Sequence, residues 1–480
     1  MLDTVLAAGL TWMETGILVY FLGVNGFYLV LLSSAAAEMW RHTHAARGED
    51  RRRILSSPVA PRVSVLAPAY NEAATIEESV RALLALEYPD LEIVVVNDGS
   101  ADATLHVLKD RFELEPVHTI YRRRLETAPV TQLYRSRINP DLVVADKANG
   151  GKADALNAAL DFATGELVCA IDADTILEPD ALLRMVRPFL RSDGVVAAGG
   201  TLRVVNGCTV RNGRVTEVRV PDSFLPAVQA VEYLRAFLFG RLGWNRLGRN
   251  LIISGAFGLF RRESVIRAGG YLHDTVGEDL ELVARLRRTA REQGRAERVE
   301  FIPDPVAWTE VPRSLRVLGR QRDRWHRGLA DTLWRHRRVL LNPRYGALGM
   351  VAFPYFTFVE LLAPVVEAVG LVGLAVGLAI GAIDGNFALL FFLVAYGLSV
   401  LLNGLTLALE EFSFQRYDRQ AQRIRLMGYS LVDSIGYRHL TVVWRIRGII
   451  SFLRGRTEWG AMERRGVGSG RRDAPETAGT

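Results

Sequence analysis

A short apolar run that ends in two acids constrains the fold of this chain most strongly. Residues 168–171 read Val-Cys-Ala-Ile, long enough for a short buried strand but not for a helix, and Asp172 and Asp174 follow. In an extended segment both carboxylates point to the same side. Open α/β sheets bind ligands beyond the carboxyl ends of their strands, where paired carboxylates suit a divalent cation on a diphosphate. Taken alone, such a pair more often consists of solvated turn or helix-capping residues, and the neighbouring motifs decide between the two interpretations.

The residues before this run alternate between strands and helices. Within residues 62–72 a strand leads into a polar turn, a helix follows over about 74–86, and a second strand over 91–96 precedes another helix. This alternation predicts an α/β fold with a doubly wound, mostly parallel sheet. We expect the basic connection 122–149 to be an insertion whose structure the sequence does not predict.

The chain also carries apolar segments that can cross a membrane. Residues 16–37 exceed the ~20 residues that span a bilayer, and no clear cleavage site follows them, so we expect an anchor. Arginines within 41–53 come next, and the positive-inside rule then places the following domain in the cytoplasm. Two further spans are expected near 361–383 and 387–409, while arginines within 428–453 favour an interfacial helix.

These segments divide the chain into five parts. They are an amino-terminal anchor (1–40), a basic cytoplasmic linker (41–60), an α/β domain (61–340), transmembrane and interfacial helices (341–453) and a cytoplasmic tail (454–480). We expect an integral protein of the cell (plasma) membrane with an outside amino terminus and a cytoplasmic α/β domain. The net charge of +6 comes mainly from arginines, without a basic stripe interleaved with aromatic residues, so membrane lipids are the expected partners and nucleic acid is not.

Other motifs suggest chemistry by residue type. Lys152 follows two glycines at the start of a helix, which suits a diphosphate, although Ala153 excludes a Walker A loop. Asp98 ends a strand, where an acid can bind a uracil N–H or ribose hydroxyls, or belong only to a tight turn. The spacing of Gln321, Arg324 and Trp325 puts them on one helix face, for which a membrane-surface helix is the alternative.

Five motifs occur along the chain in order. They are Tyr70-Asn71-Glu72, Asp98, Asp172-Ala173-Asp174, Glu278-Asp279 and Gln321-Arg322-Asp323-Arg324-Trp325. Together they resemble family 2 glycosyltransferases, above all the processive membrane synthases of hyaluronan, chitin, cellulose and poly-N-acetylglucosamine. The resemblance covers about residues 60–340 and implies a GT-A-like fold there, flanked by transmembrane and interfacial helices. Each motif alone has a structural alternative, such as acids that only pair with a helix dipole at Glu278-Asp279.

The resemblance implies roles for these residues. Asp174 and Asp172 would hold Mg²⁺ or Mn²⁺, and Asp279 would be the general base with Glu278 beside it. The nucleotide-sugar donor would be bound by Tyr70, Glu72, Asp98, Lys152, Asp172, Gln321 and Arg324. The acceptor would be contacted by Trp325, Phe257 and Gly258, and a glycine-containing core strand is the alternative for the last two residues.

We therefore expect an inverting glycosyltransferase that moves a sugar from a UDP-sugar, such as UDP-N-acetylglucosamine or UDP-glucose, to a growing polysaccharide. Two alternatives stay open: transfer of one sugar to a lipid, as in ceramide glucosyltransferase-like enzymes, and a catalytically silent membrane scaffold or export subunit. A small membrane partner subunit also stays open. Glu360 and Glu367, seven residues apart, would share one helical face along a polar path for the polymer, or lie outside the hydrocarbon.

Overall fold

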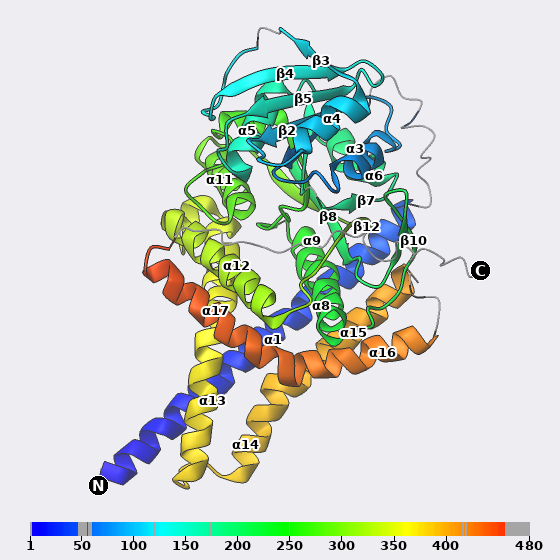
Figure 1. Ribbon diagram of the computed structural model, residues 1–480. Helices are drawn as coiled ribbons and strands as arrows, with labels where there is room; N and C mark the ends of the chain where they lie inside the picture. The colour runs from blue at the N-terminus through cyan, green and yellow to red at the C-terminus, as the bar shows by residue number, and fades with distance from the viewer. Residues whose placement is uncertain are drawn as a thin grey trace, which may run out of the picture.

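The computed structural model places an α/β domain at one end of a set of long apolar helices (Figure 1). It describes residues 2–46, 55, 60–118, 121–172, 174–248, 250–414, 417 and 420–456. Ala173, most of the predicted basic linker and nearly all of the predicted tail therefore lie outside the described residues.

One large sheet forms the centre of the α/β domain. Its strands are β1 (Val63–Ala69), β2 (Leu91–Asp98), β3 (Leu114–Val117), β4 (Val130–Ser136), β5 (Leu142–Lys147), β6 (Leu167–Ile171), β7 (Ile176–Leu177), β8 (Val195–Val204), β11 (Phe257–Arg261) and β12 (Arg298–Thr309), and a separate hairpin joins β9 (Thr209–Arg211) to β10 (Arg214–Glu217). The strand order among the described residues is β3-β4-β5-β2-β1-β6-β11-β8-β12-β7. Only β4, β11 and β7 run against the others, so the sheet is mostly parallel, as the sequence predicted.

Helices cover both faces of this sheet. They are α3 (Ile76–Leu84), α4 (Thr104–Phe112), α5 (Lys152–Phe162), α6 (Ala181–Met185), α7 (Arg187–Arg191), α8 (Phe224–Leu234), α10 (Arg262–Arg267), α11 (Glu278–Glu292) and α12 (Leu315–Arg335). Successive residues of a strand point to opposite faces. Accordingly Val65 belongs to the buried cluster that includes α3 and α4, whereas Leu66 belongs to the cluster of α5 and α11. The domain is doubly wound, and the carboxyl ends of β1, β2 and β6 meet at one edge.

The basic connection 122–149 was expected to be an insertion, but it belongs to the central sheet. Its second half forms β4 and β5, and β5 pairs in parallel with β2, from Ile93 opposite Leu142 to Asp98 opposite Lys147. Leu142 and Val144 are fully buried against the core. The expectation was wrong because the exposed, arginine-containing β4 gives this segment a polar and basic composition. The apolar Leu-Val-Val stretch of β5, which pairs with β4, is too short to stand out beside it.

The remaining helices form the apolar half of the molecule. They are α1 (Leu2–Ala46), η1 (Arg235–Arg241), α9 (Leu242–Arg246), η2 (Arg337–Val339), η3 (Pro343–Tyr345), η4 (Leu348–Ala352), η5 (Tyr355–Leu361), α13 (Ala363–Ala379), α14 (Gly385–Phe392), η6 (Leu393–Gly397), α15 (Leu398–Ser413), α16 (Gln420–Val432), η7 (Asp433–Tyr437) and α17 (Arg438–Leu453). Within the described residues two helices, Ala8–His44 and Gly385–Ser413, are long and apolar enough to cross a membrane. A third span arises if Leu348–Leu361 and Ala363–Ala379, bent by 42°, count as one.

Glu360 and Glu367 do not share one continuous helix, so that expectation was wrong. The break falls between them because Pro364 occupies the first turn of α13, where its missing N–H is tolerated, and the preceding η5 ends at Leu361. Glu360 accepts a hydrogen bond from the Tyr355 hydroxyl at 2.7 Å. Glu367 is buried and pairs with Arg438 at 2.8 Å. Both acids are satisfied by the protein.

Candidate active site

Lys152 connects two of the predicted acids at the carboxyl edge of the sheet. It opens α5, and its Nζ lies 2.6 Å from Asp172 Oδ1 at the end of β6 and 3.3 Å from Glu278 Oε1 at the start of α11. Burial lowers the pKa of Lys152, but Asp172 and Glu278 outweigh that effect and hold the pKa above its usual value. A charged ammonium group therefore sits directly beside the acid pair, with Asp174 two residues further along.

Glu278 is the buried member of this group. Burial raises the pKa of its carboxyl, although the neighbouring Lys152 lowers it. The side chain is 5 % exposed, so it faces the interior of the site and not bulk water. This placement gives Glu278 a supporting position next to Lys152.

Asp279 is held in place by two backbone amides. Its Oδ2 accepts a hydrogen bond from Gly255 N at 2.7 Å, and its Oδ1 accepts one from Leu280 N at 2.8 Å. A Cβ at position 255 would lie 2.9 Å from Asp279 Oδ2 and 3.3 Å from Lys152 Nζ. Glycine is therefore required where the loop before β11 passes the acids.

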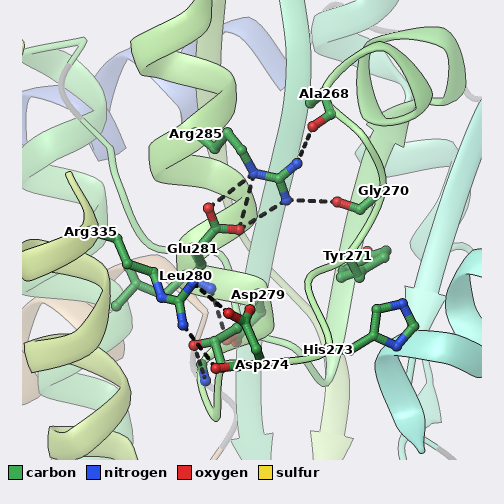
Figure 2. A network of polar contacts seen from close by, with 12 residues as sticks. Ala268, Gly270, Tyr271, His273, Asp274, Asp279, Leu280, Glu281, Arg285 and Arg335 are labelled. Carbon is green, nitrogen blue, oxygen red and sulfur yellow. Dashed lines mark hydrogen bonds and ion pairs between the residues drawn. The ribbon is translucent and has the colours of Figure 1, made fainter. Parts of the chain in front are cut away.

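A polar network fixes the first turns of α11 (Figure 2). Arg285 holds both oxygens of Glu281, donates a hydrogen bond to the Gly270 carbonyl at 2.6 Å, and also contacts the Ala268 carbonyl. Arg335, at the end of α12, binds Asp274 at 3.0 Å. The loop before α11 is thus held by contacts with both α11 and α12. These contacts fix the first turn of α11, which contains Asp279.

Asp98 lies under the glycine loop that opens α5. Its carboxylate accepts hydrogen bonds from Gly150 N at 3.0 Å and Gly151 N at 2.7 Å, and it pairs with the fully buried Lys147 at 2.5 Å. Lys147 also pairs with Asp154 at 2.5 Å. The Asp98 carboxylate therefore binds the backbone of the loop that precedes Lys152. The sequence analysis missed Lys147. Its signal in the sequence is a lysine at the end of an apolar run, and the pairing of β5 with β2 brings this lysine to Asp98.

The other predicted donor residues differ in exposure. Tyr70 is 52 % exposed at the end of β1, while the Glu72 carboxylate accepts a hydrogen bond from Thr75 Oγ1 at 2.8 Å. On α12, Gln321 is buried and Trp325 is 45 % exposed, with the Arg322 guanidinium 4.3 Å from the centroid of its ring. The structure therefore leaves Tyr70 and Trp325 open to a ligand.

Close backbone contact joins α12 to the turn that precedes Asp279. A Cβ on Gly277 would lie 3.1 Å from the Cα of Gly328, so a larger residue here would push the two backbones apart by a few tenths of an ångström. The helix that carries Gln321, Arg324 and Trp325 is therefore packed against the start of the helix that carries Asp279. The structure thus brings Asp172 and Glu278 to Lys152, places Asp98 against the loop before Lys152, and packs α12 beside the start of α11.

Residues 64–269 match the family model described as glycosyl transferase family 2, and residues 167–409 match that of glycosyl transferase family group 2. The second match covers half of the chain. This chain belongs to glycosyltransferase family 2.

Two curated relatives of this family 2 glycosyltransferase share a name. A poly-beta-1,6-N-acetyl-D-glucosamine synthase of Staphylococcus epidermidis is 27% identical over 274 residues, 57% of this chain and 56% of the relative. The Staphylococcus aureus protein of the same name is 28% identical over 295 residues, 61% of this chain and 59% of the relative. The chain thus covers less than two thirds of the length of these relatives.

A solved structure extends the likeness to the membrane helices. The mannosyltransferase PcManGT of Pyrobaculum calidifontis, solved with GDP-mannose and Mn²⁺, superposes with a TM-score of 0.55 at 22% identity. The match covers 92% of this chain and 99% of that one. This likeness concerns the fold, and it confirms the GT-A-like architecture.

Phe257 and Gly258 are placed differently from the other predicted residues of this glycosyltransferase. Phe257, the first residue of β11, is fully buried in the core, and a Cβ on Gly258 would lie 2.7 Å from Ile253. Neither residue faces the site, so their expected contact with the acceptor is corrected to a role in the core strand. In the segment around β11, Gly255 is a residue that contacts the acids, through its hydrogen bond to Asp279.

A cavity of about 350 Å³ lies between the membrane helices and the α/β domain. It is lined by aromatic and charged side chains, among them Tyr20, Tyr28, Trp244, Tyr355, Glu232, Arg235, Arg241, Glu360, Glu367, Asp433, Arg438 and Arg445. Its acids are paired: Glu232 with Arg322 at 2.6 Å, Asp433 with Arg235 at 2.6 Å, Glu360 with Arg445 at 3.4 Å and Glu367 with Arg438 at 2.8 Å. The lining is polar yet nearly neutral.

Proposed function

We propose that this enzyme transfers a sugar from a UDP-sugar to the end of a growing polysaccharide, with inversion at the anomeric carbon. The observation that carries this proposal is Asp279, held by Gly255 beside the Lys152–Asp172 pair, with α12 packed against the turn before it. N-acetylglucosamine is the favoured sugar because the curated relatives are named as synthases of its polymer.

On the donor side, Asp172 and Asp174 suit a divalent cation. No cluster of three or more His, Cys, Asp or Glu side chains that could hold a metal occurs among the described residues, so a cation here would take its other ligands from the diphosphate and water. Mg²⁺ binds in this manner, through one or two carboxylates and substrate phosphates, and the hard oxygen ligands also suit Mn²⁺. The cation would neutralise charge on the departing UDP, and Lys152 would add positive charge at the same place.

On the acceptor side, Asp279 would accept the proton of the attacking hydroxyl. Its orientation is fixed by two amides, which is the requirement for a general base that must meet one hydroxyl. Trp325 would stack against the acceptor sugar, since Arg322 covers one part of the ring and much of the side chain is exposed. Transfer would leave the chain one sugar longer beside the cavity.

The cavity would carry the polymer towards the membrane helices. Its tyrosines and Trp244 offer apolar faces for sugar rings, and its ion pairs offer hydrogen bonds without a large net charge. Such a lining suits a neutral polysaccharide better than an ionic one. Glu360 and Glu367 would thus line a polar path from two separate helices.

The deciding experiment uses the full-length protein in lipid nanodiscs with Mg²⁺ or Mn²⁺ and a panel of labelled UDP-sugars. Products much longer than the primer, formed from one UDP-sugar, support the proposal. A single sugar added to a lipid would select the lipid-glycosylating alternative. Absence of transfer from every donor, with UDP still bound, would select the scaffold.

The arrangement of the helices supports one topology. In Figure 1 the amino terminus of α1 and the turn between α13 and α14 lie at the end far from the sheet, while α16 and α17 run across the other helices. We propose that the α/β domain is cytoplasmic at the plasma membrane, with α16 and α17 against lipid headgroups. A reporter placed in the α13–α14 turn should read as outside and one after α17 as cytoplasmic. A reporter after α17 that reads as outside would overturn this topology.

A further inference from the structure

Arg241 lies where the cavity approaches the catalytic acids. It is the last residue of η1, a π-helical segment between α8 and α9, and it lines the cavity. Its guanidinium sits 3.9 Å from the centroid of the Phe237 ring, four residues earlier. Short π-helical segments are often found at functional sites, since they re-aim side chains that a regular helix would bury.

The other arginines that line the cavity are neutralised by acids. Arg235, Arg438 and Arg445 pair with Asp433, Glu367 and Glu360 at 2.6, 2.8 and 3.4 Å. Arg241, by contrast, has no ion pair and no hydrogen bond among the residues that the structure describes; its contact is the ring of Phe237. A guanidinium group has five N–H donors, and the Arg241 side chain is only partly buried and lines the cavity. The donors of Arg241 are available to a ligand in the cavity.

The charge of Asp279, the proposed base, acts on this guanidinium. Burial lowers the pKa of Arg241 to about 10, and the charge of Asp279 acts against that lowering. Arg241 is therefore protonated at neutral pH. The same side chain belongs to the cavity and lies within electrostatic reach of Asp279.

We propose that Arg241 binds oxygen atoms of the acceptor saccharide at the inner end of the cavity and so positions the acceptor hydroxyl in front of Asp279. The ligand class is a neutral sugar, whose hydroxyl or acetamido oxygens accept hydrogen bonds from the guanidinium. The inference rests on the proposed function, because it assigns a residue to the acceptor of that reaction. A purely structural alternative is that Arg241 only stacks on Phe237 to hold η1.

The test compares Arg241→Met and Arg241→Lys in the full-length protein in nanodiscs. The probes are a UDP-sugar that the wild type uses and a short N-acetylglucosamine oligosaccharide as acceptor. In Arg241→Met the KM for the oligosaccharide should rise about tenfold, the scale of one lost charge-assisted hydrogen bond, while the Kd for UDP stays unchanged. Products should become shorter, and Arg241→Lys should recover part of the lost affinity.

Arg246→Met is the matched control, since Arg246 lies on the adjoining α9 and is 46% exposed at its side chain. It should leave both constants unchanged. An Arg241→Met enzyme with wild-type KM for the oligosaccharide and wild-type product length would overturn the inference while the proposed function stands. A wild-type enzyme that extends no saccharide would overturn both. If Arg241→Met lowers the Tm, Arg241→Lys decides, because a stacking role alone predicts wild-type KM for a lysine variant that melts normally.

Discussion

The backbone amide of Gly255 donates a 2.7 Å hydrogen bond to Oδ2 of Asp279, which joins the loop before β11 to the first turn of α11. The contact is possible because position 255 lacks a Cβ, and it brings Asp279 next to Lys152. Residues separated by more than a hundred positions in the sequence thereby form one site. The proposed division of labour, with Lys152 on the donor and Asp279 on the acceptor, can be tested residue by residue.

Asp279→Asn should lower kcat at least about 100-fold, the lower end of what a general base contributes. The amide oxygen can still accept the hydrogen bond from Gly255, while the local bond from Leu280 N is lost, so the loop before β11 and the binding of UDP should change little. Turnover with labelled UDP-sugar and calorimetry with UDP measure the two quantities. The control is Asp274→Asn in the loop before α11. This acid is exposed, and Arg335 also donates a hydrogen bond to its backbone carbonyl at 2.8 Å, so the loop stays held and turnover should change little. Near-normal turnover of Asp279→Asn would remove Asp279 from the mechanism.

Asp174→Ala should weaken the binding of UDP in the presence of Mg²⁺ or Mn²⁺ and leave metal-free binding of UDP much less affected. The reason is that the carboxylate would act through a cation and not on the nucleotide itself. Calorimetric titrations with UDP, with and without the cation, measure both. Asp193→Ala, an acid on the exposed turn before β8, is the control. Identical titrations of Asp174→Ala and wild type would rule out the metal assignment.

Trp325 and Trp334 form a natural comparison on α12. Each is exposed and each lies under an arginine, Arg322 at 4.3 Å and Arg337 at 4.9 Å. Trp325→Ala should raise the KM for the acceptor about fivefold, corresponding to about 1 kcal/mol of lost stacking. Trp334→Ala removes a similar stack from the far end of the helix, so it should leave the KM unchanged. Equal effects of the two variants would contradict an acceptor role for Trp325.

The fold could be predicted from the sequence where a local pattern of apolar residues or glycines stands directly beside a functional motif. The apolar run of β6 followed by Asp172 and Asp174 predicted both a strand and its position at the ligand edge, because parallel strands place their carboxyl ends together. The helix that starts at Lys152 followed from the two glycines before it. The family signature on α12 supplied Trp325, and the structure leaves that ring exposed.

What the sequence could not supply depends on long-range pairing. Lys147 is meaningful only because β5 lies beside β2 and brings the lysine to Asp98. The sequence predicted Phe257 to be a site residue. In the structure β11 lies between β6 and β8, and the Phe257 side chain is buried there. Arg241 carries no local signal, since its availability follows from which other arginines in the cavity already have acids. Such features follow from tertiary contacts that periodicity does not encode.

The last prediction concerns His326, the residue after Trp325 on α12. Its side chain is buried, its Nε2 donates to the Leu361 carbonyl at 3.0 Å, and its Nδ1 accepts from Arg445 at 3.3 Å. These two contacts require the neutral ring with its proton on Nε2. Burial, and to a smaller extent the charge of Arg445, lower the pKa of His326 to about 3.

Because the folded pKa is depressed, the unfolded chain takes up a proton near pH 6.5 while the folded chain does not until about pH 3. Stability that is fully present above pH 6.5 is therefore lost progressively as the pH falls through that window. The Tm in nanodiscs should drop on going from pH 7 to pH 5, and His326→Gln should reduce this drop, since glutamine offers one donor and one acceptor without a titrating proton. His106→Gln, at an exposed position of α4, should leave the slope of Tm against pH unchanged. A His326→Gln protein with the wild-type slope would show that this contact between α12 and the membrane helices does not set the acid sensitivity of the fold.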